Sequence, residues 1–250
     1  AIDFQLGFTK SDTILESEQK LKYGDITVLK NIVERLKKKE PIQYILSETN
    51  FYGIKFYTRK GILIPRSETE ELVDWIIQDN KDSKKRYLDI GTGSGCIIVS
   101  ISKNLEGIFD AIDVSKESIQ IAGINILNNK VNVSLKQLDI LNDELEGEWD
   151  VIISNPPYVL NSQKEFINKN VLNWEPEKAI FVEDNNPLIF YNQIADKTLN
   201  SLSKGGFLYL EINEDFGQDV INLLNKKGFV NIELKKDING KDRMIKAMSK

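Results

Sequence analysis

The sequence predicts an α/β fold with one mostly parallel sheet, and three observations lead to it. From Tyr87 onward, strand-like and helix-like segments alternate, which is typical of a parallel sheet with helices on both faces. The last two strand-like segments are joined only through Asn239-Gly240, a link too short for a helical crossover. Residues 1–40 carry a helical pattern without strands. We therefore expect a Rossmann-like sheet of seven strands with an antiparallel last strand, preceded by a small helical region.

The strands are expected where short runs of apolar and β-branched residues occur. They cover 86–90, 108–112, 132–138, 149–154, 206–213, 229–235 and 242–248. Helices are expected between them at 95–103, 115–128, 187–203 and 214–227. Residues 159–186 form a long insertion after the fourth strand.

The chain divides into three predicted regions. Residues 1–40, ended by Pro41, are expected to be a small N-terminal helical domain, and the lack of an initiator Met suggests a trimmed start. Residues 41–66 are rich in aromatic and β-branched side chains, which predicts a β-hairpin linker with turns at its glycines. Residues 67–250 are expected to be the main domain, opening with a helix capped by a Ser67 and Glu70 capping box.

Composition excludes several classes of function. At 250 residues and 41% hydrophobic, the chain can bury a full core, and it has no apolar run long enough to span a bilayer and no secretory pattern. One cysteine rules out an internal disulfide and a thiolate metal cluster, so we expect a cytoplasmic protein without a metal. There is no histidine, so any chemistry must proceed without imidazole. The net charge of −5 and pI near 5.1 argue against nucleic acid as the main partner.

A glycine-rich turn follows the first expected strand and predicts a cofactor site. Its residues run Gly91-Thr92-Gly93-Ser94-Gly95, and glycines there let a ligand approach the backbone closely. The Gly-x-Gly-x-Gly spacing, with Asp89 before it, differs from the wider spacing of dinucleotide enzymes. This favours S-adenosylmethionine over NAD as the cofactor.

Acidic residues at the ends of the next two strands extend this site. Asp113 can accept hydrogen bonds from ribose hydroxyls, or it can cap the following helix, a role for which Ser115 is also available. Asp139 and Ile140 end the third strand, where an adenine ring could rest, although Asp139 could also be an ordinary turn residue. All of these positions share the carboxyl edge of the sheet, where ligands of open α/β sheets bind.

The fourth strand runs into Asn155-Pro156-Pro157-Tyr158, which predicts a nitrogen-methylation site. A planar –NH2 group could donate to the Asn155 side-chain oxygen and the Pro156 carbonyl while Tyr158 stacks on its flat face. Prolines favour such a geometry because they offer carbonyls without donating N–H groups. The alternative is a loop of turn-forming residues that only closes the strand.

The chain resembles the HemK/PrmC-type release factor glutamine N5-methyltransferases, which are class I S-adenosylmethionine-dependent enzymes. The similarity starts at Pro41 and continues to the end of the chain. It rests on Glu40-Pro41-Ile42-Gln43-Tyr44-Ile45, Phe51-Tyr52-Gly53, Ile64-Pro65-Arg66-Ser67-Glu68-Thr69-Glu70, Leu88 through Ile97, Asn155 through Tyr158, Trp174-Glu175-Pro176 and Asp237-Ile238-Asn239-Gly240-Lys241-Asp242-Arg243. Ser47 departs from the family, which usually has glycine there.

The resemblance implies methyl transfer from S-adenosylmethionine to the glutamine amide in the Gly-Gly-Gln motif of peptide-chain release factors, leaving S-adenosylhomocysteine. It also implies that Arg66 and Glu175 belong to the substrate site together with the Asn-Pro-Pro-Tyr residues. Two enzyme alternatives remain open. One is glutamine methylation of a ribosomal protein, and the other is N6-adenine or N2-guanine methylation of nucleic acid. A non-catalytic S-adenosylmethionine-binding module is a further alternative.

Overall fold

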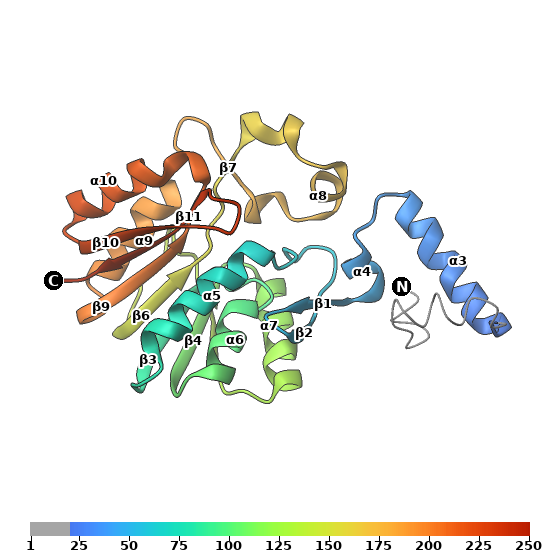
Figure 1. Ribbon diagram of the computed structural model, residues 1–250, viewed down its shortest axis with the longest axis horizontal. Coiled ribbons are helices and arrows are strands. Elements are labelled where there is room, and N and C mark those ends of the chain that lie inside the picture. The colour runs from blue at the N-terminus through green and yellow to red at the C-terminus, as the bar shows by residue number, and fades with distance from the viewer. Residues whose placement is uncertain (1–20) are drawn as a thin grey trace.

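The computed structural model describes residues 21–250 and contains the predicted seven-stranded sheet (Figure 1). Its strand order is β10-β11-β9-β6-β3-β4-β5. The five strands from β9 to β5 pair in parallel, and β11 is antiparallel to both of its neighbours. The strands are β3 (Lys85–Ile90), β4 (Gly107–Asp113), β5 (Ser134–Gln137), β6 (Trp149–Ser154), β9 (Leu202–Glu211), β10 (Val230–Lys236) and β11 (Asp242–Met248). The predicted antiparallel last strand is confirmed.

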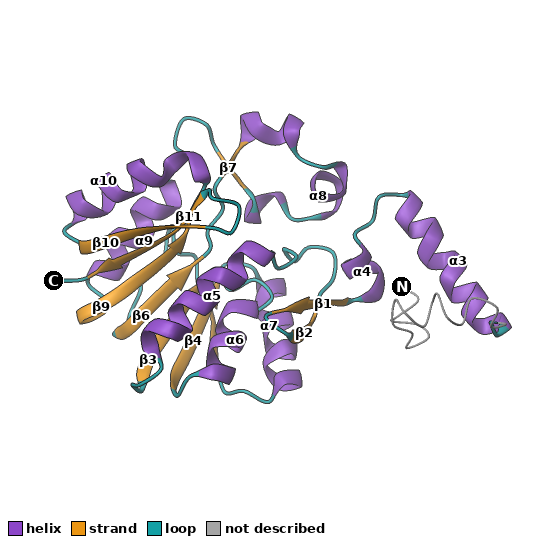
Figure 2. Cartoon of the chain, viewed as in Figure 1, coloured by secondary structure: helices purple, strands orange, loops and turns teal. Residues whose placement is uncertain are grey.

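Helices cover both faces of the sheet (Figure 2). One apolar core joins a face of the sheet to α5 (Ser67–Asn80), α6 (Cys96–Asn104) and α7 (Lys116–Asn129). The other core joins the opposite face to α9 (Ile189–Leu199) and α10 (Gly217–Lys227). Side chains alternate between these cores along a strand, so Tyr87 lies in the first and Leu88 in the second, both fully buried.

The region before the sheet is only partly a hairpin. Strands β1 (Glu48–Phe51) and β2 (Ile54–Tyr57) pair antiparallel around the turn at Gly53. Residues 62–64, part of the β-branched pattern of the expected hairpin linker, have no strand pairing, and α4 (Ile42–Leu46) occupies part of that linker. Of the expected N-terminal helical region, α3 (Tyr23–Lys37) is present, and residues 1–20 lie outside the described part of the chain.

Ser47 occupies a position whose backbone conformation favours glycine. It ends α4 in the left-handed region, with φ of 56°. An L-residue pays about 1 kcal/mol for that conformation, whereas glycine adopts it without a Cβ clash. The chain keeps the turn and bears a small local strain.

The predicted capping box at the start of α5 is wrong. The N-cap position is Arg66, which makes no side-chain cap hydrogen bond, and Ser67 is already helical. The Ser67 hydroxyl instead donates to Glu68 Oε2 at 3.0 Å. A hydroxyl one residue inside the helix is out of register with the free N–H groups that a cap serves.

The insertion forms its own small layer above the carboxyl edge of the sheet, near α8 in Figure 1. It contains β7 (Val159–Leu160), η1 (Asn161–Phe166), α8 (Lys169–Trp174), η2 (Glu177–Ala179) and β8 (Phe181–Val182). The helix expected at 187–203 ends earlier, at Leu199, because the chain enters β9 from Leu202. The helix expected from 214 begins as a short 3-10 turn, η3 (Glu214–Phe216). Within residues 21–250, no helix combines the length and hydropathy needed to cross a membrane.

Candidate active site

A cavity of about 480 Å³ opens at the carboxyl edge of strands β3, β4 and β6 and beyond the end of β5. Its volume falls in the range of small-molecule and cofactor sites. The sequence-predicted residues that line it are Gly91, Gly93, Asp113, Asp139, Ile140, Asn155, Pro156 and Pro157. Four separate turns of the chain are therefore brought to one cavity.

The glycines of the loop after β3 have two different functions in the fold. Gly91 and Gly93 have φ of 75° and 56°, and a Cβ at either would meet no atom within 4 Å. Gly95 has φ of 80°, but a Cβ there would lie 3.2 Å from Ala122 on α7. Gly91 and Gly93 thus leave room in the cavity, while Gly95 allows close packing of two helices.

The polar residues of this loop point into the protein. The Thr92 hydroxyl donates to Asp89 Oδ2 at 2.6 Å, and the Ser94 carbonyl accepts from Asn125 Nδ2 at 2.8 Å. Burial raises the pKa of Asp89 to about 7. Thr92, Ser94 and Gly95, predicted as cofactor-binding residues, are not among the residues that line the cavity. Their observed contacts hold the loop in shape.

Asp113 lines the cavity and organises the backbone around it. Its Oδ2 accepts from Gly93 N at 2.9 Å, and its Oδ1 accepts from Ser115 N at 2.8 Å. The N-cap of α7 is Ser115, whose hydroxyl accepts from Ser118 N, so Asp113 is not the helix cap. Burial raises the pKa of Asp113, and the two N–H donors partly oppose that rise.

Asp139 and Ile140 lie just beyond β5. Asp139 accepts from Leu141 N at 2.9 Å and from Asn142 Nδ2 at 2.8 Å, as in an Asx turn. Asp139 is therefore a turn residue that also lines the cavity. Ile140 is buried and adds to an apolar wall that also includes Ile112, Leu138, Phe190 and Ile194.

The loop after β6 is held from several sides. Asn155 Nδ2 donates to Thr69 Oγ1 at 3.2 Å, and the Tyr158 carbonyl accepts from Asn213 Nδ2 at 3.0 Å. The Tyr158 hydroxyl donates to Glu211 Oε1 at 3.0 Å, and burial raises the pKa of Tyr158. Asn155, Pro156 and Pro157 line the cavity, but Tyr158 does not. The Tyr158 side chain is held through its hydroxyl, and this residue, predicted to stack on a substrate amide, is not part of the cavity wall.

Arg66 and Glu175 contact each other rather than the cavity. Arg66 Nη2 donates to Glu175 Oε1 at 2.8 Å, and Ile64 N donates to Glu175 Oε2 at 3.0 Å. The Glu175 side chain is only 2% exposed. Neighbouring residues on both sides of this pair, Leu63 and Pro176, do line the cavity. The pair ties the loop before α5 to the insertion and so fixes one wall.

We expect Glu175→Ala to lower the free energy of unfolding by about 2–3 kcal/mol, because it leaves a buried N–H and a guanidinium without their acceptor. The matched control is Glu177→Ala, which removes an exposed ion pair with Lys164. That pair should contribute less than about 1 kcal/mol. Chemical denaturation of both variants checks the difference. Equal losses of unfolding free energy would contradict a stabilising role of the buried Glu175 carboxylate.

Two polar residues of this site were not predicted as site residues. Thr69 comes from the first turns of α5 and Glu211 from the end of β9, and both are buried. The Thr69 hydroxyl donates to Glu211 Oε2 at 2.6 Å. The sequence signal for Glu211 was a charged residue at the end of an apolar strand, at the same edge as Asp89 and Asp113.

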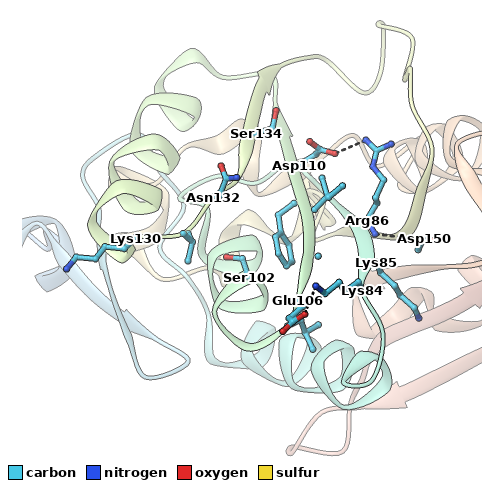
Figure 3. Close-up of a pocket in the computed structure, with 15 residues that line it drawn as sticks. Lys84, Lys85, Arg86, Ser102, Glu106, Asp110, Lys130, Asn132, Ser134 and Asp150 are labelled. Carbon is cyan, nitrogen blue, oxygen red and sulfur yellow. Dashed lines mark hydrogen bonds and ion pairs between the residues drawn. The ribbon is translucent and has the colours of Figure 1, made fainter.

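A second cavity, of about 780 Å³, lies at the opposite, amino edge of β3 and β4 (Figure 3). Two ion pairs lie in its wall: Lys84 contacts Glu106 at 3.0 Å, and Arg86 contacts Asp110 at 3.4 Å. Neither the glycine loop nor the Asn-Pro-Pro-Tyr loop reaches it. Although it is larger, we place the chemistry in the first cavity, because ligands of open α/β sheets bind at the carboxyl ends of strands.

Comparisons with known proteins extend these observations. A family model described as "Methyltransferase small domain" matches residues 69–176. The release factor glutamine methyltransferase of Flavobacterium psychrophilum is 47% identical over 242 residues, covering 94% of this chain and 85% of that protein. The enzyme of the same name from Bacteroides thetaiotaomicron is 46% identical over 222 residues, covering 88% and 80%. A solved methyltransferase structure from Pyrococcus furiosus shares the fold, with a TM-score of 0.58 and 18% identity, covering 87% of this chain and 98% of that one.

Proposed function

The chain belongs to the family of release factor glutamine methyltransferases, and on that premise we propose its reaction. It transfers a methyl group from S-adenosylmethionine to the side-chain amide nitrogen, N5, of the glutamine in the Gly-Gly-Gln motif of peptide-chain release factors. The products are the methylated release factor and S-adenosylhomocysteine. The observation that carries this proposal is that the glycine loop and Asn155-Pro156-Pro157 line the same cavity. The chain is also 47% identical to a release factor glutamine methyltransferase.

The cavity suits S-adenosylmethionine. Gly91 and Gly93 leave open space beside the backbone, which supports close approach of the cofactor. Asp113 uses one acceptor position on each oxygen for backbone N–H groups, and a carboxylate has about four such positions, so ribose hydroxyls can still bind. Ile140 and Leu138 offer an apolar surface to the adenine. When bound, the cofactor supplies an electrophilic methyl group on a positively charged sulfur.

Asn155 and Pro156 orient the substrate amide. The Asn155 side-chain oxygen and the Pro156 carbonyl each accept one hydrogen of the glutamine –NH2 group, and Tyr158, which does not line the cavity, holds the loop that carries these acceptors. A glutamine nitrogen is a poor nucleophile because its lone pair is delocalised, so orientation supplies much of the rate. As the nitrogen becomes more positive, both acceptors bind it more tightly than they bind the ground state.

The proton that the nitrogen loses needs no dedicated base in this scheme. The sequence has no histidine, and the nitrogen becomes acidic only once its bond to the methyl has formed. The proton can then leave to water. Arg66 and Glu175 support substrate binding indirectly, by fixing the wall that Leu63 and Pro176 contribute.

Other planar amines are weaker candidates. Adenine N6 and guanine N2 present a similar –NH2 group, but the chain has a net charge of −5 and a pI near 5.1. Nucleic-acid affinity comes mainly from clustered Lys and Arg. The glutamine of a ribosomal protein is a closer alternative that uses the same pocket. A cytoplasmic location belongs to the same proposal, since a single cysteine suits a reducing compartment.

A substrate panel tests the proposal. The protein is incubated with methyl-labelled S-adenosylmethionine and, separately, with a release factor, ribosomal proteins, DNA and RNA. We expect label on the release factor alone, and mass spectrometry should place it on the glutamine of the Gly-Gly-Gln motif. A release factor with that glutamine changed to alanine is the control and should stay unlabelled. Label on a ribosomal protein or on nucleic acid would replace the proposed substrate.

A further inference from the structure

We propose that Thr69 and Glu211 are positioning residues that set which end of the Asn155 amide faces the substrate. The inference rests on the proposed function, because it concerns how the pocket presents an acceptor to a glutamine amide. Asn155 contacts Thr69 directly. Glu211 acts on Asn155 through the Thr69 hydroxyl.

The direction of each hydrogen bond follows from counting hydrogens. The Thr69 hydroxyl has one hydrogen and lies 2.6 Å from Glu211 Oε2. A carboxylate offers no hydrogen, so Thr69 must donate to it. Thr69 Oγ1 can then only accept from Asn155, at 3.2 Å, and the group there must be the amino group, Nδ2. The carbonyl end, Oδ1, is left for the cavity that Asn155 lines.

Glu211 is well placed to hold this arrangement. It ends β9, beside the end of β6, and is 1% exposed. Its second oxygen, Oε1, accepts from the Tyr158 hydroxyl at 3.0 Å. One buried carboxylate therefore fixes both Thr69 and Tyr158 as donors, and through them the Asn155 amide and the loop that carries it.

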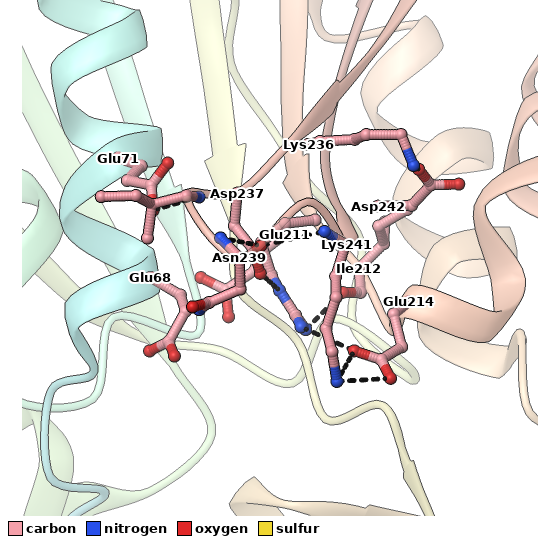
Figure 4. Close-up of polar contacts among 12 residues, drawn as sticks. Glu68, Glu71, Glu211, Ile212, Glu214, Lys236, Asp237, Asn239, Lys241 and Asp242 are labelled. Atoms are coloured by element: carbon pink, nitrogen blue, oxygen red, sulfur yellow. Dashed lines mark hydrogen bonds and ion pairs between the residues drawn. The ribbon is translucent and has the colours of Figure 1, made fainter.

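Charged groups from several elements surround Glu211 at the junction drawn in Figure 4. On β11, Arg243 contacts Asp237 at 3.1 Å, Glu214 at 3.2 Å and the Ile212 carbonyl at 3.2 Å. Its positive charge favours the ionised form of Glu211, and Glu68 on α5 opposes it. Burial is the largest influence and raises the pKa of Glu211. The family motif that includes Asp237 and Arg243 thus lies beside the carboxylate that orients Thr69.

A purely structural role for these residues makes different predictions. Thr69 also joins α5 to the sheet, so its loss could simply loosen the fold. In that case all kinetic and binding constants would worsen together with stability. A positioning role instead lowers kcat while leaving cofactor affinity and the thermal midpoint nearly unchanged.

The first test compares Thr69→Val with Thr69→Ser. Valine keeps the shape but has no oxygen, so the Asn155 amide loses its anchor and can rotate. We expect kcat on a release factor to fall about 10- to 100-fold, as for loss of an oriented catalytic group, with the Kd for S-adenosylmethionine within twofold of wild type. Serine keeps the hydroxyl and should recover most of the activity. Equal activity of the valine and serine variants, both folded, would overturn the proposal.

The second test uses Glu211→Gln and pH. Glutamine has a donor and an acceptor end, so it no longer forces Thr69 to donate, and the Asn155 amide can reverse. In wild type only the carboxylate orients Thr69, so kcat should fall as pH drops through the raised pKa of Glu211. In Glu211→Gln, kcat should be lower, and this acid limb should be absent. The same limb in both proteins would contradict the role of Glu211.

The side-chain amide signals of Asn155 in a ¹⁵N NMR spectrum separate this inference from the proposed function. They are assigned by comparison with Asn155→Ala and need no substrate. We expect a shifted, exchange-protected –NH2 pair in wild type and an unprotected pair in Thr69→Val. If wild type methylated no release factor but showed this change, the substrate would be wrong and the positioning right. If the amide signals were identical in both proteins, the positioning role would fail whatever the substrate.

Discussion

Asn155→Ala is expected to lower kcat on a release factor by about 100-fold or more, the loss typical when one preorganised hydrogen-bonding group is removed from a transition state. Asn155 lines the cavity and its amide is anchored at one end by Thr69, so the other end is the proposed acceptor for the substrate amide. Because that contact strengthens as the nitrogen gains positive charge, the loss should be in kcat more than in KM. Steady-state kinetics with the purified release factor measures both.

The control for this prediction is Asn222→Ala, at an exposed position on α10 where the side chain contacts only Gln218 among the polar groups of residues 21–250. It should keep wild-type kcat. Thermal melting and cofactor binding of Asn155→Ala should match wild type, since within residues 21–250 the side chain makes one hydrogen bond, of 3.2 Å. Near-normal turnover by a folded Asn155→Ala protein would refute the acceptor role.

Asp113→Ala is expected to raise the Kd for S-adenosylmethionine about 10- to 100-fold, the range set by losing hydrogen bonds to a charged acceptor worth about 1.5–3 kcal/mol. Two effects contribute to this expected rise in Kd. The proposed ribose contacts are lost directly, and Gly93 N and Ser115 N lose their acceptor, which loosens the loop. Isothermal titration calorimetry measures the total change.

A cofactor analogue without the ribose 2′-hydroxyl separates the two effects. Wild type should bind the analogue more weakly than S-adenosylmethionine, whereas Asp113→Ala should bind the two alike, as expected when both changes remove one interaction. If the analogue lost the same affinity in both proteins, Asp113 would act only on the loop. Unchanged affinity of Asp113→Ala for the normal cofactor would refute the ribose assignment altogether.

Much of the fold was predictable because it depends on neighbours along the chain. Alternating apolar runs placed all seven strands of the sheet, and the short link at Asn239-Gly240 predicted the antiparallel last strand correctly. The errors were local. Residues 62–64 of the expected hairpin linker have no strand pairing, and Ser67 lies inside α5 instead of capping it. At residues 62–64 a pattern compatible with a strand was overruled by a distant contact, since Glu175 binds the Ile64 N–H. At Ser67 the helix begins one residue earlier than a cap requires.

The sequence by itself determined the chemistry available at the carboxyl edge: a glycine-rich turn after β3, a carboxylate at the end of β4, and an amide followed by prolines after β6. Those features follow from residue type and strand order. Tertiary structure alone decided which groups orient them, because Thr69 lies 86 residues from Asn155 and 142 from Glu211. Side-chain hydrogen bonds over such separations depend on β9 pairing beside β6 with α5 packed across them, and no periodicity in the chain encodes that meeting. Arg66 does not line the cavity for a similar reason. Its side chain binds Glu175, which lies in the insertion, 109 residues further along the chain.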